Sequence, residues 1–583
     1  MKRSLSWFCG FTVFFAIAMA FVFWGAWSTD VSFVQPDHGG AFPADYFARK
    51  WRDICGGSSF IPSDLLDLAG GPYVWQELYY AVAMYLAALG MAYYLKGRGL
   101  PPVARYGAAA AYGLMGYNLT LFSAGHFGWF GFLMCGPFCF GLIDRCVRKG
   151  KWTNWALLGG VLAWSSARQP DIWLLFAVVA FSYGVFKTVV VIRGSLPAER
   201  KRVALRIVAG VALALVSLAL AGWPQLKNAI FVQTANRDKQ ISETTGATGK
   251  PADAGDDAEK RYVFCTNWSL PPDETLEFFW PDVNGGSSDG RVSPGNTYHG
   301  RIGIQIAPGR WQPYRQHSLY MGFITMCFAF TGMVLWLRRR KTAGCSRGGA
   351  GSNGAEMAFW VVSAVILLFC AFGAFTPFYR LVFMLPAGDY IRCPVKFVHV
   401  LEWCIAVLAG FGIAAVLDTG PARRAPRVAL VALALLAAVN AAHLAASASR
   451  YCAVDPADLV RIAVARDTGS DSLGFVMNAT GTEIGNEYVF ASGAAFRDNA
   501  LLKSAVEKGA LVPVSFWNFR GGLPVKTKRE NAGFALLKSA VRRPHDDRSM
   551  MPCPSVVISI LSTFAICAAG LVKASGRRRS PRA

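Results

Sequence analysis

The stretch "GDYIRCPVKFVHVLEW" carries ionisable side chains into a segment that is otherwise apolar. Asp389, Arg392 and Lys396 stand at its start, and His399 and Glu402 follow at spacings of three residues. Residues three or four apart lie on one face of a helix, so His399 and Glu402 are close enough to pair. Arg binds phosphate oxygens in bidentate fashion, and Lys attracts them as a point charge. These residue types therefore predict a site for a phosphate-like anion.

Pro394 predicts where the helix of this stretch begins. Proline is tolerated in the first turn of a helix but not in its interior. Asp389 and Arg392 are therefore expected in the segment before the helix, and Lys396 in its first turn. These polar side chains therefore lie at the beginning of an apolar helix.

Further polar side chains stand near the ends of other apolar segments. They are Asp30 and Asp37 after the first segment, His126 in "SAGHF", Arg168 and Asp171 in "ARQPDIW", and Tyr298 in "TYHGRIG". Charged groups at membrane depth are costly, so such residues are functional candidates by default. Carboxylates, imidazoles and cations at one bilayer surface suit a site that handles a phosphate or pyrophosphate at headgroup level.

Each of these side chains also has a purely structural interpretation. Asp30 fits a solvated loop residue beside a helix end, and His126 fits a hydrogen-bonded turn residue. Arg168 and Asp171 fit a local ion pair and helix cap. Lys396 fits a side chain that extends to the membrane interface. The sequence alone leaves both interpretations open.

The composition indicates a membrane protein. Of 583 residues, 54% are hydrophobic and only 16% are charged, and several apolar segments reach the ~20 residues that cross a bilayer as a helix. The first, Leu5 to Trp27, exceeds the ~7–15 residues of a signal-peptide core and has no A-x-A site, which predicts an uncleaved helix. The net charge of +23 is spread over short connections, which indicates membrane topology and not nucleic-acid binding.

The positive-inside rule predicts twelve membrane helices in the inner or plasma membrane, with both termini in the cytoplasm. The expected spans lie at about 5–27, 74–95, 106–123, 128–144, 154–167, 172–192, 203–223, 317–340, 357–375, 395–417, 427–447 and 555–573. Segment 376–394 is expected outside or as a re-entrant stretch.

The expected fold class is thus an all-α polytopic membrane protein with a small extracytoplasmic domain. Residues 1–447 form its transmembrane domain, including outside loops 28–73 and 224–316. Residues 448–553 form an extracytoplasmic domain of mixed α/β structure, and 554–583 form the last helix and a basic cytoplasmic tail.

The cysteines and the absence of several sequence motifs limit the classes of protein to which the chain can belong. Cys452 and Cys553 bracket the outside domain, where an oxidising compartment would permit a disulfide, and the sequence leaves the bridged and unbridged forms open. The chain has no paired CxxC spacing and no GxxxxGK[ST], HExxH or GxSxG motif. These absences argue against a nucleotide-driven pump and a zinc protease.

Three stretches resemble the YfhO family of GT-C-type bacterial membrane proteins, and the resemblance covers most of residues 1–418. They are "SAGHFGWFGFLMCGPFCFGLIDRCVRKGK" with the following "ARQPDIWLLFA", "FTPFYRLVFMLPAGDYIRCPVKF", and "FFWPDVNGG" with "YHGRIG". The resemblance implies a GT-C fold and a transferase that uses a polyprenyl-phosphate-linked sugar at the extracytoplasmic face. The acceptor is then a glycan, lipid or protein of the envelope.

The resemblance also implies roles for individual residues. An acidic residue of the first outside loop commonly acts as base in this superfamily, and Asp30 matches it best, with Asp37 second. His126 matches the His of the "GH" turn, and Arg392 and Lys396 match an "R-P-K" signature that takes the phosphate. His126 and Asp171 are expected to position sugar or acceptor. A divalent cation is compatible with these carboxylates, but no compact carboxylate cluster requires one, and no metal ligand is predicted.

The sequence departs from the family pattern at two turns. No Lys follows the "GH" in "GHFGWF", and "RQPD" has Arg168 and Gln169 where the family has His or Asn before the proline. Two other functions therefore stay open. One is a transporter or flippase of a lipid-linked envelope precursor, and the other is a non-catalytic envelope assembly protein.

Overall fold

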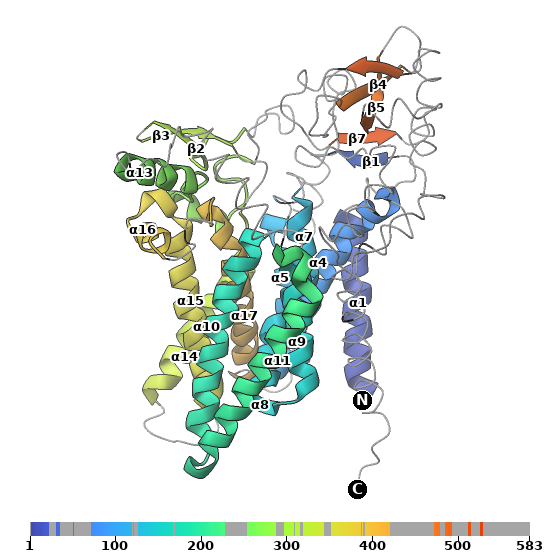
Figure 1. Cartoon of the computed structure of the whole chain (residues 1–583). Coiled ribbons are helices and arrows are strands. Elements are labelled where there is room, and N and C mark those ends of the chain that lie inside the picture. Colours follow the sequence, from blue (N-terminus) through green and yellow to red (C-terminus); the bar gives the residue numbers. More distant parts are fainter. Residues whose placement is uncertain are drawn as a thin grey trace.

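The apolar segments of the chain form a bundle of long helices, in which each helix bonds its own backbone N–H and C=O groups. The structure is a computed structural model (Figure 1). It describes residues 2–22, 31–34, 51, 64, 72–118, 121, 126–166, 170–227, 254–286, 297–307, 309–314, 319–342, 351–385, 388, 391–419, 472–478, 484–492, 511–514, 525–528 and 562.

The described helices are the helices of the bundle and a set of shorter helices between some of them. The helices of the bundle are α1 (Lys2–Val22), α4 (Pro72–Gly97), α5 (Pro102–Gly113), α7 (Phe127–Cys135), α8 (Phe138–Lys149), α9 (Trp152–Ser166), α10 (Pro170–Gly194), α11 (Arg200–Lys227), α14 (Phe323–Thr342), α15 (Gly351–Ala371) and α17 (Phe397–Thr419). Short helices are η1 (Pro197–Glu199), α13 (Ala254–Cys265), η4 (Pro272–Phe278), η5 (Gly373–Phe375), α16 (Phe378–Phe383) and η7 (Pro394–Lys396).

The strands among the described residues form three small antiparallel sheets. They are β1 (Val31–Val34), β2 (Gly303–Ala307), β3 (Arg310–Pro313), β4 (Ser472–Asn478), β5 (Ile484–Ser492), β6 (Leu511–Val514) and β7 (Val525–Lys528). Strand β1 pairs with β7, β2 pairs with β3, and the third sheet has the order β5-β4-β6. In the predicted extracytoplasmic domain the described residues are strands β4 to β7, and the helices expected there lie outside the described residues.

Seven helical segments among the described residues are long and apolar enough to cross a membrane, which indicates a membrane protein. They are Leu5–Val22, Leu78–Gly97, Gly128–Lys149, Ile172–Gly194, Pro197–Trp223, Gly354–Ala371 and Pro394–Leu417. A shorter apolar segment, Phe323–Val334, belongs to α14. The predicted span 427–447, and 555–573 apart from residue 562, lie outside the described residues, so the count of twelve stays a prediction.

One predicted span is divided into two helices. The segment 128–144 contains the end of α7 and the beginning of α8, with Gly136 and Pro137 between them. Pro137 has no N–H to continue the hydrogen-bond ladder. A Cβ on Gly136 would lie 2.1 Å from the ring of Phe132, so a larger residue would displace this buried ring. The break therefore follows from local sequence, although the apolar pattern runs straight through it.

Prolines and a glycine mark the ends of several helices. Pro102 and Pro170 are the first residues of α5 and α10, where a missing N–H costs nothing. Helix α8 ends at Gly150, which has a φ of 59° and donates its N–H to the carbonyl of Cys146. Glycine adopts this left-handed conformation without strain. Within the predicted span 106–123, α5 ends at Gly113, and residues 116–118 are helical again.

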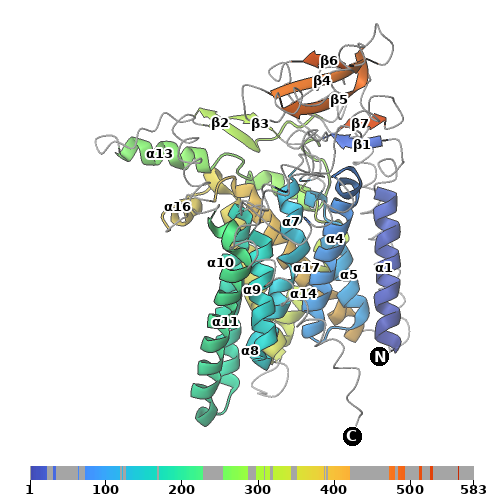
Figure 2. The ribbon, with the colours of Figure 1, turned by 45° about the vertical axis from the view of Figure 1, so that its right-hand side comes forward.

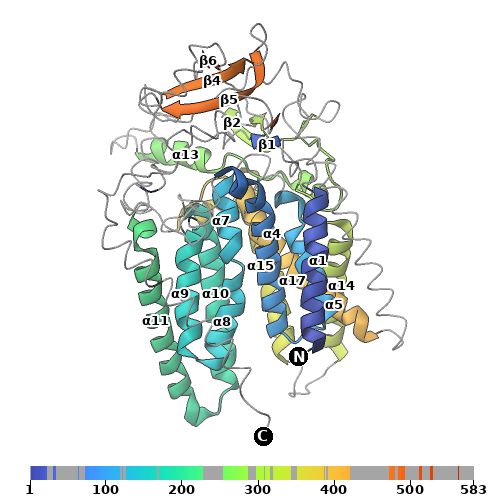
Figure 3. The same cartoon turned by 90° about the vertical axis from the view of Figure 1, so that its right-hand side faces the viewer.

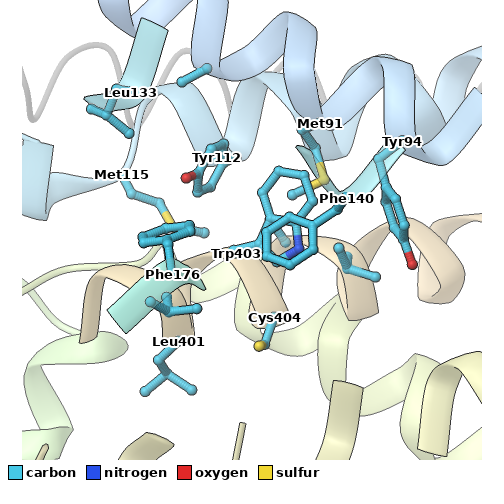
Figure 4. Packing of buried hydrophobic residues seen from close by; sticks show 14 of the residues in the cluster. Met91, Tyr94, Tyr112, Met115, Leu133, Phe140, Phe176, Leu401, Trp403 and Cys404 are labelled. Atoms are coloured by element: carbon cyan, nitrogen blue, oxygen red, sulfur yellow. The ribbon is translucent and has the colours of Figure 1, made fainter. Parts of the chain in front are cut away.

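Helix α17 lies at the centre of the bundle, between α4, α5, α14 and α15 (Figure 1). Trp403 of α17 is fully buried and stacks on Phe140 of α8 at a ring distance of 4.8 Å. Figure 4 shows both rings beside Tyr94 and Tyr112. Such aromatic packing contributes beyond the area that it buries, by about 0.5–1.5 kcal/mol per pair. The centre of the bundle is therefore a rigid support for side chains on α17.

Helices α1 and α11 lie at the edges of the bundle (Figure 2). Leu205, Val208, Leu215 and Leu220 of α11 are exposed, as is Ile17 of α1. Apolar side chains on the outside of a helical bundle suit the hydrocarbon of a bilayer. A helix that faces lipid bonds its own backbone groups and therefore requires no polar side chains on that face. These helices thus line the lipid-facing surface expected of a membrane protein.

All strands lie at the end of the bundle opposite the N-terminus, together with α13 and α16 (Figures 1 and 3). This end is called the outer end below, and the opposite end the inner end. The outer end contains the segments that the sequence assigns to the extracytoplasmic side, such as β1 and β4. The arrangement is consistent with the predicted topology, and which end faces the cytoplasm stays a prediction.

Candidate functional site

The segment before α17 is held in place by backbone hydrogen bonds to the end of α13. The N–H of Cys393 donates to the carbonyl of Cys265 at 3.0 Å, and the N–H of Val395 donates to Trp268 at 3.0 Å. Cys393 has a positive φ of 61°, and the N–H of Lys396 donates to its carbonyl at 2.9 Å. Helix η7 begins at Pro394 and leads into α17, which confirms the predicted start of this helix.

Trp129 joins two of the predicted site residues at the outer end. The Lys396 Nζ lies 5.9 Å from the centre of the Trp129 ring, a distance at which the ring face attracts a cation. His126, the residue before α7, stacks on the same ring at 6.1 Å. His399 contacts it edge-on at 5.2 Å. His126, Trp129, Lys396, His399 and Glu402 are called the outer cluster below.

His399 and Glu402 form a buried pair one turn below Lys396. The Nδ1 of His399 lies 3.5 Å from the Oε2 of Glu402, and the two residues are 0% and 1% exposed. The predicted i,i+3 proximity is thus confirmed, but the distance is too long for a strong hydrogen bond. Among the described residues, neither nitrogen of His399 has a hydrogen-bond partner, and neither has Glu402 Oε1. The Glu402 carboxyl group also interacts with the backbone of Tyr117.

Aromatic rings surround the His399 imidazole. Tyr117 lies 5.9 Å from it and Phe176 5.8 Å, both edge-on. An unpaired polar group in such surroundings costs about 1–3 kcal/mol, so native structures keep few of them and each needs a reason. The outer cluster therefore combines a cation on an aromatic face with an imidazole and a carboxyl group that have unused hydrogen-bonding capacity. Such a set can bind an anionic group and exchange a proton with it.

Arg392 and Tyr298 are placed differently from Lys396. The guanidinium of Arg392 lies over the ring of Phe264 in α13 at 5.6 Å, so the two predicted phosphate ligands rest on different aromatic rings. The Tyr298 hydroxyl is buried, donates to Glu274 at 2.7 Å and accepts the N–H of Ile302 at 2.7 Å. Tyr298 thus orders the segment before β2.

Five of the predicted site residues are not covered by the structure. Asp30, Asp37, Arg168 and Asp389 lie outside the described residues, and Asp171 belongs to α10 without a described side chain. Their roles stay predictions. In the part of the chain that is described, no group of three His, Cys, Asp or Glu side chains is close enough to hold a metal ion.

A second charged cluster, at the inner end, was not predicted from the sequence. It consists of Arg98, Asp144, Lys187 and Glu356, whose side chains are at most 3% exposed, and is called the inner cluster below. Lys187 Nζ lies 3.0 Å from Asp144 Oδ1 and 2.9 Å from Glu356 Oε2. Arg98 pairs with Glu356 at 2.9 Å and also with Asp144. Each of the four charges thus faces two opposite charges.

Hydroxyl groups complete the inner cluster. Tyr94 donates to Glu356 Oε1 at 2.6 Å, and Tyr183 donates to the same oxygen. The indole N–H of Trp360 donates to Tyr94 at 2.6 Å. The half-exposed Arg148 adds a bond to Asp144 at 2.9 Å. These contacts connect α8, α10 and α15 to the end of α4.

One sequence signal could have revealed the inner cluster. Lys187 in "GVFKTVVV" and Glu356 in "GAEMAFWVV" are single charges in apolar surroundings, and such charges are almost always paired or functional. Their opposite signs would suggest that they meet. The spacing along the chain does not show which helices lie side by side, so the four-membered arrangement requires the structure.

No family model matches the chain, and no match was found among curated proteins or solved structures. The resemblance to the YfhO family stays an expectation. Function is therefore inferred from the geometry of the two clusters.

Proposed function

We propose that this protein is an integral membrane glycosyltransferase of the GT-C type. It transfers a sugar from a polyprenyl-phosphate donor to an envelope acceptor at the outer end of the bundle. The observation that carries the proposal is the meeting of Lys396 and His126 on Trp129, at the start of two bundle helices. The resemblance to the YfhO family supports the same assignment.

Lys396 and its surroundings suit the phosphate of a lipid-linked donor. The lysine is 9% exposed and begins a membrane-length segment, so it lies where a lipid phosphate meets the hydrocarbon. When the bond between the sugar anomeric carbon and the phosphate oxygen breaks, negative charge develops on the phosphate. A preplaced cation stabilises this charge in the transition state.

The second requirement is a base for the acceptor hydroxyl. The acceptor oxygen forms a bond to the anomeric carbon, the polyprenyl phosphate leaves, and the hydroxyl proton passes to the base. Asp30 is the proposed base and Asp37 the second candidate. Val31, which follows Asp30 in the sequence, begins β1 at the outer end. This supports a first outside loop that reaches the same end as Lys396.

The test measures sugar transfer in proteoliposomes with radiolabelled polyprenyl-phosphate glucose, mannose and galactose and solubilised envelope glycan as acceptor. Lys396→Met keeps an apolar stem without the charge and should lower transfer at least tenfold, which is about 1.4 kcal/mol of transition-state stabilisation. Lys396→Arg should retain part of the activity. Lys149→Met, an exposed lysine of α8, is the matched control.

Mass spectrometry of envelope glycans from cells with and without the protein provides an independent measurement. Asp30→Asn should reproduce the glycan profile of cells without the protein. Unchanged transfer by Lys396→Met, or unchanged glycans in cells without the protein, would overturn the proposal.

The inner cluster favours one second candidate, a transporter or flippase of a lipid-linked precursor. Buried charges within membrane helices mark ion and substrate pathways in many transporters. In the inner cluster, however, each charge has two opposite partners, which favours a structural role. A transporter would move unmodified donor across sealed vesicles, whereas the proposed enzyme releases polyprenyl phosphate on the outer side.

A further inference from the structure

Three cysteines lie close together at the outer end. Cys265 is the last residue of α13, Cys370 is near the end of α15, and Cys393 precedes η7. All three thiols interact with the Tyr379 phenol of α16 and, after burial, contribute to raising the pKa of Tyr379 well above its usual value. Segments far apart in the sequence therefore bring three thiols around one side chain.

Of the three cysteines, Cys265 and Cys393 have the most direct backbone contact. Their peptide groups are joined directly, because the N–H of Cys393 donates to the carbonyl of Cys265 at 3.0 Å. A backbone N–H···O bond places the two peptide groups in direct contact, and disulfides form between residues whose Cα atoms lie about 4.4–6.8 Å apart. The two backbones are thus neighbours, as a disulfide requires.

Both backbones are also fixed on either side of the pair. The N–H of Thr266, next to Cys265, donates to the Tyr262 carbonyl at 2.9 Å. Lys396 and Val395 fix the segment after Cys393 by their own N–H bonds. Cys393 has a left-handed conformation, with a φ of 61°, that side-chain-bearing residues rarely adopt. Such strain persists only where surrounding structure enforces it.

We propose that Cys265 and Cys393 form a disulfide at the outer end of the protein. The structure describes both residues as thiols. Their oxidation joins the two sulfurs and releases two protons and two electrons. The electrons reduce the disulfide of an oxidant, either a protein dithiol–disulfide catalyst or a small disulfide, to two thiols. This exchange requires an oxidising compartment, which agrees with the extracytoplasmic assignment of the outer end.

The bond would tie the outer cluster to α13. Cys393 lies three residues before Lys396, and its carbonyl accepts the N–H of Lys396. A covalent link to Cys265 therefore restricts the segment that places the lysine against Trp129. A surface contact already connects the same regions, since Arg380 of α16 binds Glu259 of α13 through two bonds of 3.0 and 3.1 Å. The inference does not depend on the proposed transferase activity.

The test maps disulfides in the full-length protein purified without reductant. The protein is denatured in the presence of N-ethylmaleimide, digested and analysed by mass spectrometry. The expected result is a peptide containing Cys265 linked to one containing Cys393, with alkylation of both cysteines at least tenfold lower than after reduction. Alkylation of both in the unreduced protein, or a link from either one to another cysteine, would refute the proposal.

Variants provide a second measurement. Cys265→Ser should expose Cys393 to alkylation, and Cys393→Ser should expose Cys265. Cys370→Ser is the matched control and should leave the link intact. A reductant should lower the melting temperature of the wild type more than that of Cys265→Ser, and a reductant-insensitive wild type would contradict the bond.

Discussion

At the inner end of the bundle, buried cations and anions surround one another, and Lys187 and Arg98 each contact both Asp144 and Glu356. At the outer end, Lys396 lies over an aromatic ring, and His399 and Glu402 retain nitrogen and oxygen atoms with no described hydrogen-bond partner. Both ends use charged side chains in an apolar bundle. They differ in the ion pairs: each inner charge faces two close opposite charges, although Arg98 Nε also has no described hydrogen-bond partner.

This difference separates a structural role from a binding role. Removing charges from water costs several kcal/mol per ion, which close opposite charges and hydroxyl groups can offset. The inner cluster has these partners, so its four helices hold one another without any ligand. In the outer cluster, the two nitrogens of His399 and Glu402 Oε1 have no described hydrogen-bond partner, and a ligand can supply one. Incomplete pairing therefore points to the outer end as the site, although the inner end contains more charge.

The largest expected effect comes from breaking the inner cluster. Glu356→Gln removes the anion that pairs with Arg98 and Lys187 and leaves both cations undercompensated. Removing one partner of a buried pair typically costs about 3–5 kcal/mol of unfolding free energy. The measurement is denaturant unfolding in detergent micelles, with exposed Glu199→Gln as the control. A variant as stable as the wild type would show that the inner cluster is not structural.

A smaller effect, of opposite sign, is expected from His399→Leu in the outer cluster. Leucine has a similar volume and removes two buried nitrogens that have no described partner, so the unfolding free energy should stay unchanged or rise by about 1 kcal/mol. Sugar transfer should fall about tenfold if the imidazole contacts the ligand. Unfolding and transfer are measured on the same preparation. Destabilisation as large as that of Glu356→Gln would remove the difference between the two ends.

The sequence predicts individual helices well where single residues determine their ends. Pro170 begins α10 two residues before the expected start, and Pro394 begins the turn that leads into α17. The break between α7 and α8 is missed because Gly136 and Pro137 interrupt an apolar pattern that itself continues. Local geometry, and not hydrophobicity, determines that break.

The candidate site is predictable only in part, for a different reason. The sequence assigns His126 and Lys396 to the same end of the bundle because both stand at the outer ends of apolar segments. Their common contact is Trp129, which reads as one more apolar residue of "GHFGWF". Glu356 likewise gains its partners from α10 and from the end of α4. Side-chain packing decides which helices are neighbours, and no local pattern in a single sequence shows these neighbours.

The smallest expected effect tests the aromatic part of the outer cluster. Trp129→Phe keeps a ring beneath Lys396 but weakens its attraction for a cation, because Trp is the aromatic ring that attracts cations most strongly. The KM for polyprenyl-phosphate sugar should rise about two- to fivefold, with kcat nearly unchanged, because the ring positions the lysine without taking part in bond breaking. Trp129→Leu removes the ring face and should raise KM further. An equal loss of kcat in both variants would instead mean that Trp129 contacts the reacting groups, and the outer cluster would then extend to the bond that breaks.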